Sequence, residues 1–270
     1  MLQRLKASLR AGVGRLVPSA LRPRAAAILP TDYGDGDLLI HVDSDYERNV
    51  RTIPCAKEPD TIRWIHSLIK PGETVFDVGA NVGNYSLIIA KRLNGNVKVY
   101  AFEPAWFNFT QLNRNIALNR FGSSIFPICA GLSARSGLVW LNYSTLEYGS
   151  SLHSLGAAVR LRDQAFTPVL CQPVASFTLD QAVGYLEATP NHIKIDVDGI
   201  ESEILAGGAA TLKDPALRSI LVELSRNNKD DSDAIDRVLG AGFKLWNVEE
   251  KPRNAFVNFA EYANYIFVRE

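Results

Sequence analysis

Two glycines and a carboxylate carry the first chemical signal in this sequence. The stretch Thr74–Ala90 reads TVFDVGANVGNYSLIIA, an apolar start, a glycine-containing loop and then apolar residues at helical spacing. Because glycine has no Cβ, Gly79 and Gly83 let the backbone turn tightly and approach a ligand. Asp77 places a carboxylate at the mouth of the same loop. The pattern predicts a strand, a ligand-binding loop and a helix.

A second carboxylate, Glu103, ends the next apolar run in the segment YAFEP. At a strand end it can accept hydrogen bonds from both hydroxyls of a ribose, as in many adenosine-containing ligands. A dinucleotide loop would have glycine where Asn81 stands and a free helix start where Tyr85 lies. Asp77 would repel a phosphate but suits an ammonium group. These features favour S-adenosylmethionine, which contains adenosine and an ammonium group but no phosphate.

Two further carboxylates follow a buried-looking strand at residues 193–197. Side chains alternate along a strand, so Asp196 shares a face with Lys194 and Asp198 continues that spacing. Two like charges there indicate a general base, hydrogen bonding to a substrate, or a divalent cation. A pair between Lys194 and Asp196 would argue against a free base. A D-x-D at a strand end also occurs in metal-dependent glycosyltransferases, which makes that class a competing interpretation.

Several other side chains are candidates for the same site, on weaker evidence. Glu223 follows the strand core ILVEL, and His153 lies in a long loop, so both are candidates for the acceptor side. Tyr85 is counted with the cofactor loop. Glu58 precedes the helix that leads into the cofactor strand, although an acid at a helix start has a simpler explanation. Trp106 follows Glu-Pro, where it would either cover adenine or pack its own helix.

Strands and helices alternate from residue 74 onward, and this order positions both groups of candidates. It predicts an α/β fold with a mostly parallel sheet and helices on both faces. The last two strands have no helix between them and should pair as an antiparallel edge. Expected strands are 38–42, 74–78, 97–103, 124–130, 138–144, 193–197, 219–224, 243–248 and 265–268, and expected helices are 62–69, 84–93, 106–119, 201–212 and 231–241.

Two segments stand apart from this alternation. Residues 144–172 have little periodicity, and a long loop inside a compact domain is usually functional, so they are expected to form a lid. Residues 1–30 carry six basic residues and no acid, with apolar residues at helical spacing. This predicts a basic amphipathic helix, either peripheral or in contact with an anionic membrane surface. We expect an N-terminal extension over 1–54 and the main domain over 55–270.

Composition limits the remaining choices. The 270 residues include 29 basic and 29 acidic residues, so the formal net charge is zero and a general nucleic-acid binder is disfavoured. The three cysteines are widely spaced, which predicts reduced core thiols in a cytoplasmic protein. No apolar run of 18 residues and no clear signal-peptide cleavage site are present.

Seven segments in this order resemble the FkbM-type methyltransferases over about residues 55–270: VFDVGANVGNYSL, VYAFEPAWFNFTQLNRNIALN, AGLSARSG, FTLDQ, IKIDVDGIESEILAGG, ILVEL and NYIFVRE. The resemblance implies a Rossmann-like class I fold with a seven-stranded sheet whose last strand is antiparallel. It also implies O-methyl transfer from S-adenosylmethionine to a hydroxyl of a sugar, glycan or small natural product.

The resemblance also assigns individual positions. Asp196 matches the family's strand-end acid on the reactive side of the cofactor, and Glu103 matches its ribose-binding acid. Asp198 departs from the family, which more often has Glu there, so a carboxylate is kept but retracted by one methylene. The positions that match the cofactor loop are Asp77, Gly79, Asn81 and Gly83.

Three functional hypotheses therefore stand side by side. The first is an S-adenosylmethionine-dependent O-methyltransferase with Asp196, Asp198, Glu223 and His153 as catalytic candidates and no assigned metal ligand. The second is a metal-dependent glycosyltransferase that uses Asp196 and Asp198. The third is a non-catalytic binding protein on a methyltransferase fold. The acceptor, the need for a metal and the oligomeric state are left open.

Overall fold

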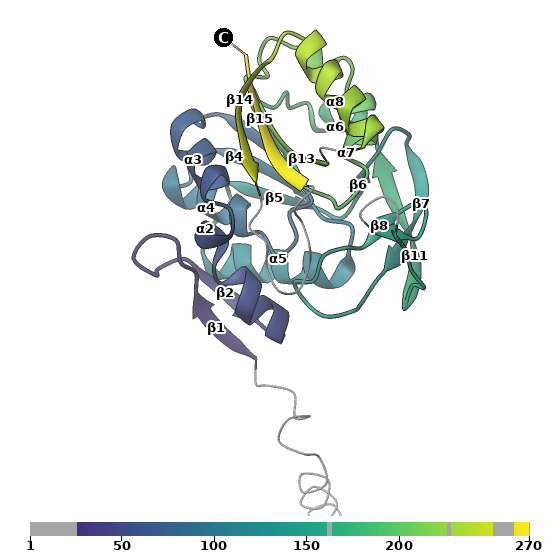
Figure 1. Cartoon of the computed structure of the whole chain (residues 1–270). Helices are drawn as coiled ribbons and strands as arrows, with labels where there is room; N and C mark the ends of the chain where they lie inside the picture. Colours follow the sequence, from purple (N-terminus) through teal and green to yellow (C-terminus); the bar gives the residue numbers. More distant parts are fainter. Residues whose placement is uncertain (1–25, 161–163, 226–227, 251–261, 270) are drawn as a thin grey trace, which may run out of the picture.

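The computed structural model describes residues 26–160, 164–225, 228–250 and 262–269 (Figure 1). The basic helix predicted near the N-terminus, and with it the predicted membrane contact, lies outside the described residues. Within the described ranges, no helix combines the length and apolar character that crossing a bilayer would require.

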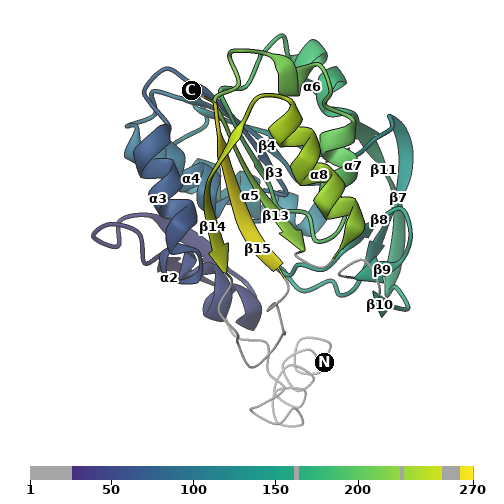
Figure 2. The same cartoon turned by 45° about the horizontal axis from the view of Figure 1, so that its top comes forward.

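A seven-stranded sheet forms the centre of the molecule, in the order β14-β15-β13-β12-β3-β4-β5 (Figures 1 and 2). Its strands are β3 (Thr74–Val78), β4 (Lys98–Phe102), β5 (Ile125–Ile128), β12 (His192–Ile195), β13 (Ser219–Ser225), β14 (Lys244–Glu250) and β15 (Tyr262–Val268). Neighbouring strands are parallel except at β15, which is antiparallel to both β13 and β14. The predicted mostly parallel sheet with an antiparallel last strand is confirmed. The last two strands do pair, but β15 is inserted between β13 and β14, and only β14 lies at the edge.

Helices cover both faces of this sheet because its strand side chains alternate. Val75 packs into the core shared with α3, α4 and α5, whereas the next residue, Phe76, packs into the core shared with α6, α7 and α8. Figure 2 shows α3 and α4 on one side of the sheet and α7 and α8 on the other. The helices are α2 (Pro54–Lys57), α3 (Pro59–Leu68), α4 (Asn84–Arg92), α5 (Trp106–Leu118), α6 (Leu179–Leu186), α7 (Glu201–Ala206) and α8 (Lys229–Gly240), with shorter helices η2 (Glu47–Arg51) and η3 (Thr211–Lys213).

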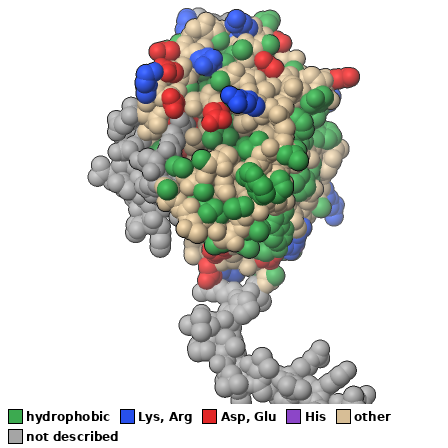
Figure 3. Space-filling model, turned by 90° about the vertical axis from the view of Figure 1, so that its right-hand side faces the viewer, with side chains coloured by type: hydrophobic (Ala, Val, Ile, Leu, Met, Phe, Trp, Pro, Cys, Tyr) green, Lys and Arg blue, Asp and Glu red, His purple; other side chains and the backbone are tan. Residues whose placement is uncertain are grey.

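The region between the two halves of the large sheet forms a second, four-stranded sheet in the order β6-β11-β7-β8. Its strands are β6 (Gly131–Leu132), β7 (Gly137–Tyr143), β8 (Ser154–Leu155) and β11 (Leu170–Phe177), and β9 (Val159–Arg160) pairs with β10 (Gln164–Ala165). The segment expected to be a loop therefore contains β8, β9, β10 and the start of β11. Hydrophobic side chains gather on the outer face of this region (Figure 3), among them the exposed Leu138, Trp140 and Val169.

A hairpin of β1 (Ala27–Pro30) and β2 (Leu39–Val42) packs on α5, and the strand predicted at 38–42 is confirmed. The side chain of Asn119 bonds both the N–H and the carbonyl of Leu39, and Asn115 accepts from His41 N at 2.7 Å. Ile40 is fully buried in the same core as β3 and α4. These residues thus belong to the same core as the cofactor strand, while the domain boundary near residue 55 stays a prediction.

The prediction of core thiols is wrong in part. All three cysteines are free, as expected, but Cys129 and Cys171 are exposed and Cys55 is half-buried. Cys171 lies near the start of β11, opposite Asn142 of β7 in the smaller, four-stranded sheet. An apolar residue type therefore does not by itself place a side chain in the core.

Candidate active site

A cavity of about 80 Å³ lies at the carboxyl ends of β3, β4 and β12. This is the edge at which open parallel sheets bind ligands. Six residues singled out in the sequence line it: Gly79, Asn81, Glu103, His153, Asp196 and Asp198. The two groups of candidates therefore meet in one site.

The loop after β3 is pressed against the end of β12. A Cβ on Gly79 would lie 2.0 Å from the carbonyl oxygen of Asp196, and the φ of Gly79 is +82°. Only glycine fits this position without moving backbone. Gly83 also has a positive φ, but a Cβ there would meet Leu112 of α5 at 2.6 Å. Gly83 thus permits close packing of α5 against the loop, and it does not line the cavity as the sequence had suggested.

Asn81 connects the loop to both neighbouring walls. Its backbone, in the left-handed region with φ +52°, donates its N–H to Oε2 of Glu103 at 2.8 Å. Its side chain donates from Nδ2 to the carbonyl of Ser150, also at 2.8 Å, and accepts from Val82 N at 3.0 Å. Asparagine tolerates this backbone conformation better than most residues. Its amide adds contacts that a glycine would not provide.

Glu103 is buried at the tip of β4 with both carboxylate oxygens facing backbone donors. Oε1 accepts from Ala105 N and Oε2 from Asn81 N, each at 2.8 Å. Burial raises the pKa of Glu103 to about 7, although these backbone bonds and the Arg51 guanidinium act in the opposite direction. A carboxylate has about four lone-pair positions, so acceptor capacity remains for a ligand.

A buried ammonium group lies beneath the cavity. Lys194 Nζ is 2.9 Å from Asp196 Oδ2 and 4.9 Å from the centre of the Tyr85 ring. Burial lowers the pKa of Lys194, but the carboxylates of Asp196, Asp77 and Glu58 outweigh it, so the pKa is raised overall. The predicted pairing of Lys194 with Asp196 is confirmed. Removing one partner of such a buried pair typically destabilises a protein by about 3–5 kcal/mol.

Asp77, Tyr85 and Glu58 form the layer around this ammonium and do not line the cavity. Asp77 accepts a 2.6 Å hydrogen bond from Ser86 Oγ, and burial raises its pKa while Lys194 lowers it. Burial likewise raises the pKa of Tyr85 well above its usual value. Asp77 therefore lies behind the cavity wall, and its role at the mouth of the loop stays a prediction.

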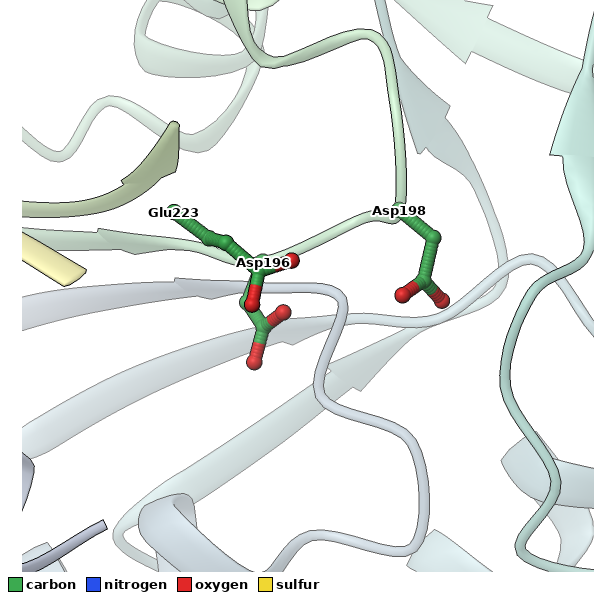
Figure 4. A group of neighbouring side chains, drawn as sticks. All are labelled: Asp196, Asp198 and Glu223. Atoms are coloured by element: carbon green, nitrogen blue, oxygen red, sulfur yellow. The ribbon is translucent and has the colours of Figure 1, made fainter. Parts of the chain in front are cut away.

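Asp196, Asp198 and Glu223 bring three carboxylates together at the ends of β12 and β13 (Figure 4). One oxygen of each lies within 4.8 Å of one in each of the others, a spacing that can accommodate a cation. The Lys194 ammonium already supplies a positive charge to Asp196. Glu223 reaches the group from β13 and is buried, whereas Asp196 and Asp198 are partly exposed.

The segment between β7 and β8 closes over the cavity and is fastened at several points. Asp198, at φ +63°, accepts a 2.7 Å hydrogen bond from the backbone of Leu152, which itself has φ +64°. Asn108 of α5 accepts from Gly149 N at 2.8 Å and donates to Ser150 O at 3.0 Å. The residues 144–155 are called the lid below. Asn108 was missed from sequence, because a polar residue in the first turn of a helix is ordinarily solvent-facing.

His153 is held within the lid by aromatic and hydroxyl neighbours. Its ring lies 5.4 Å from the rings of Phe107 and Tyr143. Nδ1 is 3.3 Å from Ser144 Oγ, and Nε2 is 3.2 Å from Ser150 Oγ. These contacts fix the lid against α5 and β7.

Trp106 is not among the residues that line the cavity. It is 43% exposed and packs edge-on against Phe107, with 5.5 Å between ring centres. Pro104 and Ala105 line the cavity at this point of the chain. The contact predicted between Trp106 and adenine therefore has no support in the geometry, whereas the alternative of helix packing does.

The comparisons with known proteins agree on one family. A family model described as the methyltransferase FkbM domain matches residues 77–245, which include the cavity residues named above. Methyltransferase sdnD of Sordaria araneosa is 32% identical over 154 residues, which cover 49% of this chain and 59% of that protein. The hexuronic acid methyltransferase AglP of Haloferax volcanii is 26% identical over 168 residues, or 62% of each chain. These matches span about three fifths of each relative.

Two further similarities extend this result. The 31-O-demethyl-FK506 methyltransferase FkbM of Streptomyces tacrolimicus is 26% identical over 198 residues, covering 66% of this chain and 75% of that protein. The crystal structure of methyltransferase FkbM from Methylobacillus flagellatus KT is similar with a TM-score of 0.50 and 14% identity. That match covers 76% of this chain and 50% of the other, and it supports the Rossmann-like fold.

Proposed function

Because this chain belongs to the FkbM methyltransferase family, we propose that it transfers a methyl group from S-adenosylmethionine to a hydroxyl oxygen of a sugar, glycan or other small natural product. Two relatives support this acceptor class, one named for a hexuronic acid and one for demethyl-FK506. The observation that carries the proposal is the buried carboxylate of Glu103 beside the Gly79 loop at one edge of the sheet.

The residues present fit this cofactor. Glu103 lines the cavity and keeps acceptor capacity for the ribose hydroxyls of an adenosine, and Gly79 lines the same cavity where the loop meets the carbonyl of Asp196. Among the described residues, the carboxylates of Asp77, Asp196 and Glu58 surround the buried ammonium of Lys194 and outnumber it. Such a site attracts the ammonium and sulfonium charges of S-adenosylmethionine and repels a pyrophosphate.

When bound, S-adenosylmethionine supplies an electrophilic methyl carbon whose bond to sulfur breaks as the acceptor oxygen bonds to it. The protein must hold the acceptor oxygen in line and receive its proton. We assign the proton-accepting role to Asp198, which lines the cavity just beyond β12 and keeps carboxylate lone pairs besides the one that accepts from Leu152 N. Lys194 holds Asp196, Glu223 lies buried on β13, and both ring nitrogens of His153 contact serine hydroxyls.

Thermal unfolding with three ligands tests this assignment. We expect S-adenosylhomocysteine at about 100 times its Kd to stabilise the protein by about 2.7 kcal/mol. NAD, and manganese with a nucleoside diphosphate, should leave the melting temperature unchanged. Glu103→Ala should abolish the shift, whereas Asp236→Asn on the exposed side of α8 should keep it.

Two outcomes would contradict the proposal. A shift with NAD and none with S-adenosylhomocysteine would identify a dinucleotide site. A shift with manganese and the nucleoside diphosphate alone would favour the glycosyltransferase hypothesis, which uses Asp196 and Asp198. We also propose a cytoplasmic location, because three free thiols suit a reducing compartment.

A further inference from the structure

A second cavity of about 450 Å³ lies beside the first, between the lid and the helices α7 and α8. It lies within the range of about 300–1,000 Å³ that is usual for small-molecule sites. His153, Val197 and Asp198 line both cavities, so the two are separated only by a shared wall. A molecule in the second cavity would therefore reach the carboxyl end of β12 from the side opposite Glu103.

The charged side chains around this second cavity are mostly acidic. Among the described residues that line it, the carboxylates are Asp198, Glu203, Asp230 and Asp233, and the only cationic side chain is Arg237. Asp233 also pairs with Lys229 at 2.8 Å, but Lys229 points to solvent with 85% exposure and does not line the cavity. Among the described residues, the lining of this cavity therefore carries more negative than positive side chains.

Carboxylates also gather at the shared wall of the two cavities. Asp196, Asp198 and Glu223 gather there within 4.8 Å, and the buried ammonium beside them is that of Lys194. Glu223 is buried and Asp196 and Asp198 are half-buried, so water screens their charges only in part over the few ångströms to an acceptor. The sulfonium of a bound cofactor would compensate part of this negative charge, whereas a second anion would increase it.

From this arrangement we infer that the second cavity is the acceptor site and that it selects a hydroxylated molecule carrying an ammonium group, of the amino-sugar class, over one carrying a carboxylate. This inference rests on the proposed methyl transfer and adds the chemistry of its acceptor. An ammonium placed between Glu203 of α7 and Asp230 of α8 would be attracted by both. A carboxylate in the same place would meet like charges on two sides, and unfavourable charge pairs are an effective means of discrimination.

Matched sugars that differ in one charged group test the inference. The probes are methyl glucosaminide, methyl glucoside and methyl glucuronide, and their Kd values are measured by NMR titration at pH 7 and low salt. The full-length protein is first saturated with S-adenosylhomocysteine. We expect the glucosaminide to bind about tenfold more tightly than the glucoside, and the glucuronide to bind least, in line with one or two favourable charge contacts. The preference should shrink as salt is added, because exposed charges are screened.

Variants then locate the binding. Glu203→Gln and Asp230→Asn should each weaken glucosaminide binding about threefold while leaving glucoside binding nearly unchanged. Asp236→Asn is the matched control, because Asp236 is also on α8 but does not line the cavity. It should change neither affinity.

The outcomes separate this inference from the proposed function. If S-adenosylhomocysteine does not bind, the methyltransferase proposal fails first. If it binds but the glucosaminide does not, or the glucuronide binds equally well, only the acceptor inference is overturned. An undiminished preference for the glucosaminide in both Glu203→Gln and Asp230→Asn would also overturn it, because the binding would then lie outside the second cavity.

Discussion

Glu103→Gln is the substitution that isolates the proposed cofactor contact. The amide keeps the size of the side chain but removes its charge, while the two backbone donors, Asn81 N and Ala105 N, remain in place. An amide has one oxygen, so it can accept fully from only one of them, and its NH₂ faces the other. We expect the affinity for S-adenosylhomocysteine to fall about tenfold to a hundredfold, because hydrogen bonds to a charged group contribute about 1.5–3 kcal/mol.

The pH dependence follows from the raised pKa of Glu103. Burial raises this pKa from 4.5 to about 7, so between these values the folded protein keeps a proton that the unfolded chain has released. The stability from this group is therefore fully present below pH 4.5 and is lost as pH rises through 7, a change of about 3 kcal/mol. Ribose hydroxyls donate to the ionised form, so cofactor affinity changes in the opposite direction. It should rise about tenfold between pH 6 and pH 8.

Calorimetric titration of S-adenosylhomocysteine at pH 6, 7 and 8 measures the binding effect, and urea unfolding at pH 5 and 8 measures the stability effect. Glu187→Gln is the control, because Glu187 is exposed at the end of α6. In Glu103→Gln the pH dependence of binding should disappear, and the pH dependence of stability should lose the share contributed by Glu103. Equal affinity at pH 6 and pH 8 in the unsubstituted protein, or tight binding by Glu103→Gln, would refute the role assigned to Glu103.

Two further substitutions test the loop and the lid. Gly79→Ala should destabilise the protein by about 3 kcal/mol in urea unfolding, because its Cβ would meet the carbonyl of Asp196. Gly184→Ala, where the new Cβ would lie in open space within a helix, should stabilise the protein by about 0.5–1 kcal/mol. Equal stability of the two variants would contradict the close approach of Gly79 to Asp196. Asp198→Ala should speed amide hydrogen exchange at Leu152 about tenfold or more, whereas Asp198→Asn, which keeps an acceptor oxygen, should not. Unchanged exchange in Asp198→Ala would show that this bond does not hold the lid.

The central sheet could be predicted from sequence because its signals are local. An apolar run such as Thr74–Val78, bounded by turn residues, predicts a strand whatever lies elsewhere in the chain, and this strand is found as predicted. Alternation of strands and helices then fixes the parallel sheet and the edge at which ligands bind. The convergence of Gly79, Glu103 and Asp196 follows from that topology.

The second sheet and α6 could not be predicted in the same way. Strands of two residues, such as Ser154–Leu155, show no periodicity and exist because a longer neighbour pairs with them. α6 does carry a local signal, since Thr178 caps it by accepting from Gln181 N. Its eight residues are short for a periodic pattern, and no helix was predicted there.

The contacts made by the lid are the part of the site that could least be predicted from sequence. Leu152 and Asp198 are 46 residues apart in the sequence, and neither residue type predicts a contact with the other. Asn81 seemed to depart from a glycine pattern, yet its amide reaches Ser150 in a segment that had no predicted structure. The position after Glu-Pro left two possibilities for Trp106, adenine cover or helix packing, and the structure places its half-exposed ring against Phe107. Side-chain direction at a helix start depends on packing that only the fold supplies.

A structure of the protein with S-adenosylhomocysteine tests the central claim most directly. We predict that the ribose hydroxyls lie within hydrogen-bond distance of the Glu103 carboxylate, and that the sulfur faces the Asp196–Asp198 end of β12 toward the second cavity. A nucleoside bound elsewhere, with no ligand contact to Glu103, would contradict the account.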